Sequence, residues 1–278
     1  MEGSAGIASP GLAAGAYRSP PFTPPLIARR LPSLAFYARA APIVWRAGRK
    51  ASRGPYDDGA WSRSSLEIFR ALEAVGVRIE IDGVEGLAGV DGPCVFVGNH
   101  MSTLETFLLP TIIRPLKPVT FVVKKELAAY PVFGHVMRSR NPVLVGRANP
   151  RDDLRAVLEG GEQRLRAGIS VVIFPQTTRT PVFDPSAFNS IGIKLARRAQ
   201  VPVVPIALKT DAWGNGRIVK DIGRIDPAQT VHFRFGEPLR VTGTGATEQR
   251  QIVEFINRSL RGWGGTVAQG AAQERASD

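Results

Sequence analysis

The sequence of 278 residues has a single cysteine, Cys94, and only three histidines. One cysteine excludes an intramolecular disulfide framework and favours a reducing compartment. The spacing of the Cys, His and carboxylate residues matches no zinc site, so no bound metal is expected. There is also no apolar run of about 18 residues, the length that a membrane-spanning helix needs. The first residues lack a basic segment followed by an apolar one, so we expect no secretory signal.

Acidic residues are scarce, and none occurs between Glu2 and Asp57. The whole chain has 36 Lys and Arg against 24 Asp and Glu, which gives a formal charge of +12. Such a balance favours anionic partners, meaning phosphates, phospholipid surfaces or nucleic acid. The hydrophobic content of 44% is sufficient for one large folded domain with appendages.

Composition divides the chain into four segments. Residues 1–25 are rich in Gly, Ala, Ser and Pro, and we predict a disordered leader there. Residues 26–60 form a basic arm, and residues 61–261 form the folded domain. Residues 262–278 are small and polar, which is typical of a disordered tail.

The basic arm alternates apolar and aromatic side chains with arginines. Pro32 and Pro42 are expected to break it into short helices, which are too charged to span a bilayer. Apolar side chains beside arginines suit an amphipathic segment that lies on an anionic membrane surface. An ordinary arm that packs on the domain and keeps its charges in solvent explains the same pattern equally well.

Strands and helices alternate along the folded domain. Apolar runs of strand length recur, at 77–82, 94–97, 119–123, 142–145, 170–174, 203–208 and 231–235. Helical patterns lie between many of them, for example over 150–167. This alternation predicts an α/β fold with a mainly parallel central sheet flanked by helices.

The most informative stretch follows the strand at 94–97. Asn99 and His100 lie at the tip of that strand, and Ser102 with Glu105 three residues later is a capping box that begins a helix. A histidine at a strand end with a carboxylate five residues later suits a general base and the group that orients it. The capping box alone also accounts for Glu105, so both roles stay open.

Two further loops that follow predicted strands carry polar side chains. One contains Lys124 and Lys125, which point opposite ways in an extended segment, so only one of them can face a site. The other contains Gln176, Thr177, Thr178 and Arg179. Open α/β sheets bind their ligands at the carboxyl ends of strands. A base, a lysine, hydroxyls and an arginine gathered there suit chemistry on a phosphorylated substrate.

These loops carry motifs that resemble those of the glycerolipid acyltransferases related to lysophosphatidic acid acyltransferase. Asn99–Glu105 resembles their first motif, Asn-His-x-x-x-x-Asp, and Lys125–Gly134 is similar to their second. Phe174–Thr180 looks like the third, Phe-Pro-Glu-Gly-Thr-Arg-Ser, and Val201–Ile206 matches the fourth. Each is weak alone, but four in this order across residues 75–260 are specific.

The resemblance implies an O-acyltransferase of phospholipid biosynthesis. Such an enzyme moves a fatty acyl group from acyl-CoA or acyl carrier protein to the hydroxyl of a lysophospholipid. His100 would remove the hydroxyl proton, and Glu105 would fix the imidazole. Arg179 would grip the acceptor phosphate. The substrate-binding residues that the resemblance implies are Asn99, Lys125, Gln176, Thr177, Thr178 and Arg179. No cofactor or metal is implied besides the acyl thioester, and we expect a peripheral protein on the cytoplasmic face of the inner membrane.

The sequence departs from the family motifs at two places. Glu105 replaces the usual Asp and shifts the carboxylate by about a bond length, although a related group of lipid A acyltransferases tolerates either acid. Gln176 and Thr177 replace Glu-Gly in the loop that shapes the acceptor pocket.

Lysophosphatidic acid is the first expected acceptor. The alternatives are another lysolipid, such as a lyso-ornithine-type lipid, and an inactive lipid-binding homologue. A nucleic-acid-binding protein is disfavoured because no nucleic-acid module is recognised.

Overall fold

The computed structural model of the protein describes residues 9–12, 15–146, 148–176, 178–217 and 219–268. An eight-stranded sheet crosses its centre in the order β1-β2-β9-β8-β3-β6-β4-β5. These strands are β1 (Tyr17–Arg18), β2 (Ile79–Asp82), β3 (Val95–Gly98), β4 (Val119–Lys124), β5 (Val143–Val145), β6 (Ser170–Ile173), β8 (Val203–Lys209) and β9 (Val231–Phe235). The neighbouring strands β8, β3, β6, β4 and β5 are parallel to one another. Strand β9 is antiparallel to β8, and β1 is antiparallel to β2.

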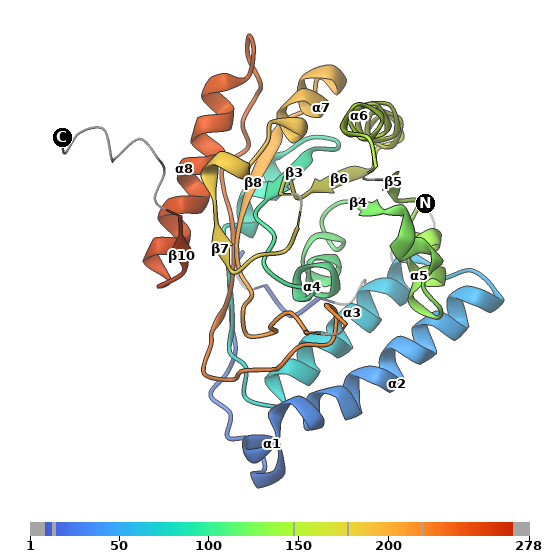
Figure 1. Cartoon of the computed structure of the whole chain (residues 1–278), viewed down its shortest axis with the longest axis vertical. Coiled ribbons are helices and arrows are strands. Elements are labelled where there is room, and N and C mark those ends of the chain that lie inside the picture. The colour runs from blue at the N-terminus through green and yellow to red at the C-terminus, as the bar shows by residue number, and fades with distance from the viewer. Residues whose placement is uncertain (1–8, 13–14, 147, 177, 218, 269–278) are drawn as a thin grey trace.

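Helices cover both faces of this sheet (Figure 1). One face carries α2 (Pro32–Arg53), α3 (Asp58–Glu73), α4 (Leu104–Ile113) and α5 (Phe133–Ser139), and the short α1 (Leu26–Arg30) packs against α2. The other face carries α6 (Pro150–Arg166), α7 (Ile191–Ala199) and α8 (Ala246–Gly262). The 3-10 turns η1 (Val84–Gly89), η2 (Lys125–Ala129) and η3 (Pro185–Ala187) lie in the connections. The α/β fold with a mainly parallel sheet is therefore as predicted.

The central strand β3 shows why its sequence is continuously apolar. Phe96 packs into the core on one face of the sheet, and Val95 and Val97 pack into the core on the other. Successive side chains of a strand point to opposite faces, so a strand covered on both sides has no polar positions. Cys94, which precedes this strand, is also buried, and burial raises the pKa of its thiol to about 11. The thiol is therefore protonated at neutral pH.

The arm is divided before Pro32, as predicted, because α1 ends at Arg30 and α2 begins at Pro32, but it is not divided at Pro42. Helix α2 runs for 22 residues with Pro42 in its interior, so the expected break at Pro42 is wrong. Pro32 lies in the first turn, where proline costs little. Buried side chains along one side of α2, including Phe36 and Ile43, pack on the domain. This packing outweighs the backbone hydrogen bond that Pro42 removes. In the described part of the chain, no helix is long and apolar enough to cross a bilayer.

Parts of the predicted leader and tail are ordered, which corrects the prediction of disorder there. Tyr17 lies in β1, is largely buried and donates a hydrogen bond from its hydroxyl to Glu73 at 2.5 Å. Near the other end, β10 (Thr266–Val267) pairs with β7 (Val182–Phe183) in a second, two-stranded sheet. Composition cannot reveal such contacts because a few well-placed residues make them. The remainder of both segments, 1–8, 13–14 and 269–278, lies outside the described residues.

Candidate active site

The sheet brings the first and third predicted loops together. Strands β3 and β6 are parallel neighbours, so the loops that follow them leave the sheet at the same edge. Both the N–H and the carbonyl of His100 are hydrogen-bonded to the third predicted loop, which follows β6. Its N–H donates to Gln176 Oε1 at 2.7 Å, and its carbonyl accepts from the N–H of Thr180 at 3.0 Å. The histidine therefore has a fixed backbone position.

The ring of His100 is held in one plane and one orientation. It stacks on Phe174, with ring centroids 4.4 Å apart and an angle of 6° between the planes. Its Nδ1 lies 2.9 Å from Glu105 Oε2. The side chain is 16% exposed, and no hydrogen bond to Nε2 is present in the described part of the chain. Nε2 is therefore the ring nitrogen that is left to exchange a proton with a substrate.

Glu105 has both of the roles that the sequence left open. Its fully buried carboxylate uses Oε2 for His100 and Oε1 for the helix terminus. Oε1 accepts from the N–H groups of Met101 and Ser102 at 2.8 and 2.9 Å, and from Thr210 Oγ1 at 2.5 Å. Because different oxygens serve the two functions, helix capping does not compete with orientation of the imidazole.

Asn99 makes contacts other than those predicted. Its side-chain amide donates to the carbonyl of Leu208 at 2.7 Å, and its Oδ1 accepts from the Leu208 N–H at 2.9 Å. With 1% of its surface exposed, Asn99 joins β3 to β8, and its amide fixes the strand end that carries His100. Substrate binding by Asn99 stays a prediction.

Gln176 is likewise a buried positioning group, because its Oε1 accepts from the backbone of His100. Contact of Gln176 with the substrate stays a prediction. Thr177 lies outside the described residues. Thr178 is exposed at the same loop, where its Oγ1 accepts from Lys220 Nζ at 3.3 Å.

Arg179 lies at the site and is already paired. Its Nη1 donates to Asp221 Oδ1 at 2.6 Å and also to Thr103 Oγ1. Thr103 in turn donates to Asp221 at 2.9 Å, which closes a ring of three side chains. Because Thr103 lies between His100 and Glu105 in the chain, this ring joins the arginine to the loop that carries the histidine.

Comparison with known proteins agrees with this geometry. Residues 78–209 match the family model described as Acyltransferase. A 1-acyl-sn-glycerol-3-phosphate acyltransferase of Pseudomonas aeruginosa is 35% identical over 204 residues, which is 73% of each chain. The chain belongs to this acyltransferase family. The chloroplastic 1-acyl-sn-glycerol-3-phosphate acyltransferase BAT2 of Brassica napus is 32% identical over 142 residues, 51% of this chain and 39% of that protein.

A solved structure shows that this acyltransferase also shares the fold of its family. The crystal structure of the 1-acyl-sn-glycerophosphate (LPA) acyltransferase from Thermotoga maritima superposes with a TM-score of 0.61 at 21% identity. The superposition covers 87% of this chain and 99% of that one. The predictions of an O-acyltransferase and of its family are therefore confirmed.

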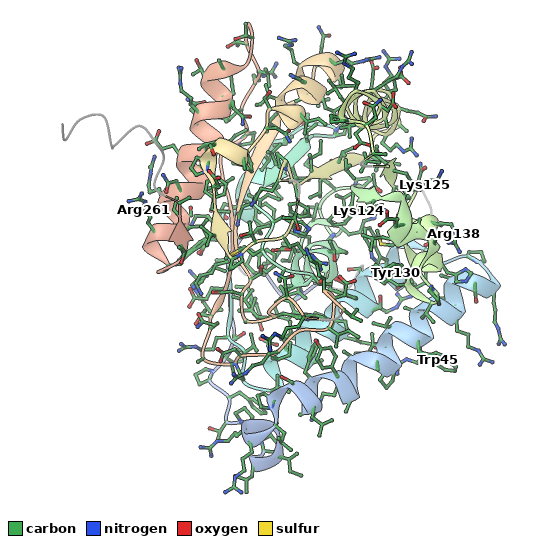
Figure 2. All side chains as sticks on the ribbon, in the orientation of Figure 1. Trp45, Lys124, Lys125, Tyr130, Arg138 and Arg261 are labelled. Atoms are coloured by element: carbon green, nitrogen blue, oxygen red, sulfur yellow. The ribbon has the colours of Figure 1, made fainter. Side chains whose placement is uncertain are left out.

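The second predicted loop of this acyltransferase carries two exposed lysines. Lys124 ends β4 and Lys125 begins η2, and both side chains are exposed beside α5 (Figure 2). In the described part of the chain, neither lysine is bonded to His100 or Arg179. A role for Lys125 in substrate binding stays a prediction.

Sequence reasoning missed two residues of the acyltransferase site. Thr210 is fully buried, and its carbonyl also accepts from Ser102 Oγ at 3.0 Å. Its position directly after the apolar strand β8, a neighbour of β3, was an available signal. Asp221 lies in a glycine-rich loop far along the chain from Arg179, and no pattern in the sequence pairs the two.

Proposed function

We propose that this acyltransferase moves a fatty acyl group from an acyl-CoA or acyl carrier protein thioester to the hydroxyl of a lysophospholipid, with lysophosphatidic acid as acceptor. The observation that carries the proposal is the pair of His100 and Glu105, in which the carboxylate holds Nδ1 and leaves Nε2 for the substrate. The names of the relatives, which act on 1-acyl-sn-glycerol-3-phosphate, support the acceptor and a place in phospholipid biosynthesis.

The proposed reaction is a direct transfer. Nε2 of His100 takes the proton of the acceptor hydroxyl while that oxygen attacks the thioester carbon. The tetrahedral intermediate collapses, the C–S bond breaks, and the thiolate takes the proton back from the imidazolium. The Glu105 carboxylate stabilises the imidazolium and fixes its tautomer. The acyl thioester is a co-substrate, and the proposal includes no metal, bound cofactor or acyl-enzyme intermediate.

Arg179→Ala should chiefly raise the KM for the acceptor. A guanidinium that makes charge-assisted hydrogen bonds to a phosphate contributes about 1.5–3 kcal/mol, so the acceptor KM is expected to rise about tenfold to a hundredfold. The KM for the acyl donor should stay unchanged. Steady-state kinetics with each substrate varied in turn measures both constants. Arg155→Ala is the control, because Arg155 is an exposed arginine of α6 whose one ion pair with the described residues is to Glu159. A defect confined to the donor KM contradicts the phosphate role.

The arm presents an apolar and basic surface that suits peripheral binding to an anionic membrane. Its large exposed apolar side chains are Leu26, Ile27, Leu31, Leu34 and Trp45. Trp45 projects from α2 away from the domain (Figure 2). Beside it, Arg46, Arg49, Lys50 and Arg53 line an open groove of about 480 Å³. Tryptophan and arginine side by side are typical of the membrane interface. Peripheral attachment at the cytoplasmic face of the inner membrane follows as part of the proposal.

The double variant Ile27→Ser/Leu34→Ser should weaken binding to vesicles that contain anionic phospholipid. The two side chains are 72% and 64% exposed, so the fold should not depend on them. The loss of two apolar anchors is expected to reduce vesicle affinity about tenfold or more. Vesicle sedimentation measures the change. Leu144→Ser, at an exposed leucine of β5 on the folded domain, is the matched control. Unchanged binding of the double variant would show that the arm only packs on the domain.

The acceptor is tested by comparing kcat/KM for lysophosphatidic acid and for a lyso-ornithine-type lipid. The proposal predicts a preference for lysophosphatidic acid in the wild type and loss of that preference in Arg179→Ala. A preference for the phosphate-free lipid would show instead that the altered third motif, with Gln176 and Thr177, has changed the acceptor.

A further inference from the structure

The loop between β8 and β9 connects the arm to the active site. We call residues 211–217 and 219–226 the bridging loop. Its two sides run antiparallel, because Trp213 and Ile225 form a bridge and the N–H of Gly214 donates to the carbonyl of Arg224 at 2.9 Å. The loop is therefore an ordered, hairpin-like element.

The base of the bridging loop is fixed on helix α2. Tyr37 Oη donates to the carbonyl of Gly223 at 2.6 Å, and the N–H of Ile225 donates to Ser33 Oγ at 3.0 Å. The Trp213 ring packs edge-on against Phe36, with centroids 4.8 Å apart. It also stacks on Phe107 of α4 at 5.4 Å. These contacts hold the loop between the arm and the helix that begins at the active site.

The other part of the bridging loop reaches the catalytic residues. Asn215 donates to the carbonyl of Met101, next to His100, at 2.9 Å. Asp221 accepts from both Arg179 and Thr103. Lys220 donates to Thr178, the residue before Arg179. The loop thus places the Asp221 carboxylate on Arg179 and the Lys220 ammonium group on the neighbouring Thr178. Arg179, Asp221 and Lys220 together therefore keep a net positive charge.

The hydrogen bonds of Arg179 show which part of its guanidinium group Asp221 holds. Both contacts of the guanidinium, to Thr103 and to Asp221, use Nη1. In the described part of the chain, Nε and Nη2 make no hydrogen bond, and together they form the edge that binds a phosphate through two parallel bonds. A carboxylate on Nη1 leaves that edge without a hydrogen-bond partner among the described residues and fixes its direction.

We propose that Asp221 is a positioning residue for the acceptor phosphate, and that it acts by holding Arg179 through Nη1. The inference rests on the proposed function, because it takes Arg179 as the phosphate-binding group. The proposal predicts that the loss of Asp221 weakens acceptor binding. If the Asp221 carboxylate instead occupied the phosphate site, the phosphate would have to displace it, and the loss of Asp221 would strengthen acceptor binding.

The test is a double-mutant cycle with acceptor KM as the readout. Asp221→Ala should raise the KM for lysophosphatidic acid about tenfold, with kcat and the donor KM nearly unchanged. In an Arg179→Ala background the same substitution should have no further effect. Asp221→Asn keeps an oxygen that accepts from Nη1, so its KM should lie between those of the wild type and Asp221→Ala. The KM for monoacylglycerol, which lacks the phosphate, should not change in any of these variants.

Asp226→Ala is the matched control, because it removes the same charge from the same loop, and among the described residues the Asp226 side chain bonds the N–H of Ala228 alone. An equal rise in acceptor KM for Asp221→Ala and for Asp226→Ala would overturn the proposal. A fall in acceptor KM for Asp221→Ala, or effects of Asp221→Ala and Arg179→Ala that add, would also overturn it. Calorimetric binding of a short-chain lysophosphatidic acid is measured in parallel. If the wild type binds this lipid but does not acylate it, the proposed function fails, while weaker binding by Asp221→Ala alone still supports the positioning role.

Discussion

His100→Ala is expected to lower kcat by about a thousandfold, the range that a positioned general base supplies. Nε2 is the ring nitrogen that no described residue bonds, and no other histidine is near it in sequence. The fold should be retained, because the two hydrogen bonds of the His100 backbone to the third-motif loop do not depend on the ring. Steady-state acyl transfer and far-ultraviolet circular dichroism measure the two effects.

His135→Ala is the control for that substitution. His135 lies in α5, where the one hydrogen bond of its ring to a described residue is with Arg138. Its loss should leave kcat unchanged. Turnover by a folded His100→Ala variant at a rate close to that of the wild type would remove His100 from the role of base.

Glu105→Gln should reduce both activity and stability. The glutamine NH₂ group must face either His100 Nδ1 or the two backbone N–H groups at the start of α4, and each choice sets donor against donor. The expected loss is about a hundredfold or more in kcat, because the imidazolium is no longer stabilised. The free energy of unfolding should fall by about 1–3 kcal/mol, because a buried donor loses its acceptor. Kinetics and urea denaturation measure the two quantities.

Two further variants separate the roles of this carboxylate. Glu105→Asp keeps the charge on a side chain about 1.5 Å shorter, so it should retain more activity than Glu105→Gln while losing one set of contacts. Thr210→Val removes a single donor to Oε1 of Glu105, so it should lower kcat less than Glu105→Gln or Glu105→Asp does. If Glu105→Gln kept full kcat and lost only stability, Glu105 would be a helix cap without a catalytic role.

The sequence predicted secondary structure best where local physics decides it. Strand β9 was predicted with its bounds, 231–235, because apolar and polar residues alternate there. Helix α6 begins after Asn149, whose side chain caps it, with Pro150 in the first turn. Pro42 was misjudged because its effect depends on packing across α2, and the order around Tyr17 depends on a contact with Glu73. Neither contact is local in sequence.

The same distinction holds within the active site. His100 and Glu105 are five residues apart on one strand-to-helix connection, so their contact could be predicted from spacing alone. Thr210 bonds Glu105 across 105 residues, and Asp221 bonds Arg179 across 42. Asn99 and Gln176 lie in recognisable motifs, yet their partners are backbone groups that only the assembled sheet brings near. Motifs therefore indicated which loops form the site, while the division into substrate-facing and positioning residues required the three-dimensional arrangement.

The most direct measurement is the transfer of a labelled acyl group to lysophosphatidic acid by the purified full-length protein, with acyl-CoA and acyl carrier protein tested separately as donors. A parallel reaction uses the 2-deoxy analogue of the acceptor, which keeps the phosphate and lacks the hydroxyl. We predict labelled phosphatidic acid from lysophosphatidic acid with at least one donor and no labelled lipid product from the analogue. Absence of product with both donors, from folded protein that still binds lysophosphatidic acid, would contradict acyl transfer to this acceptor by His100 and Glu105.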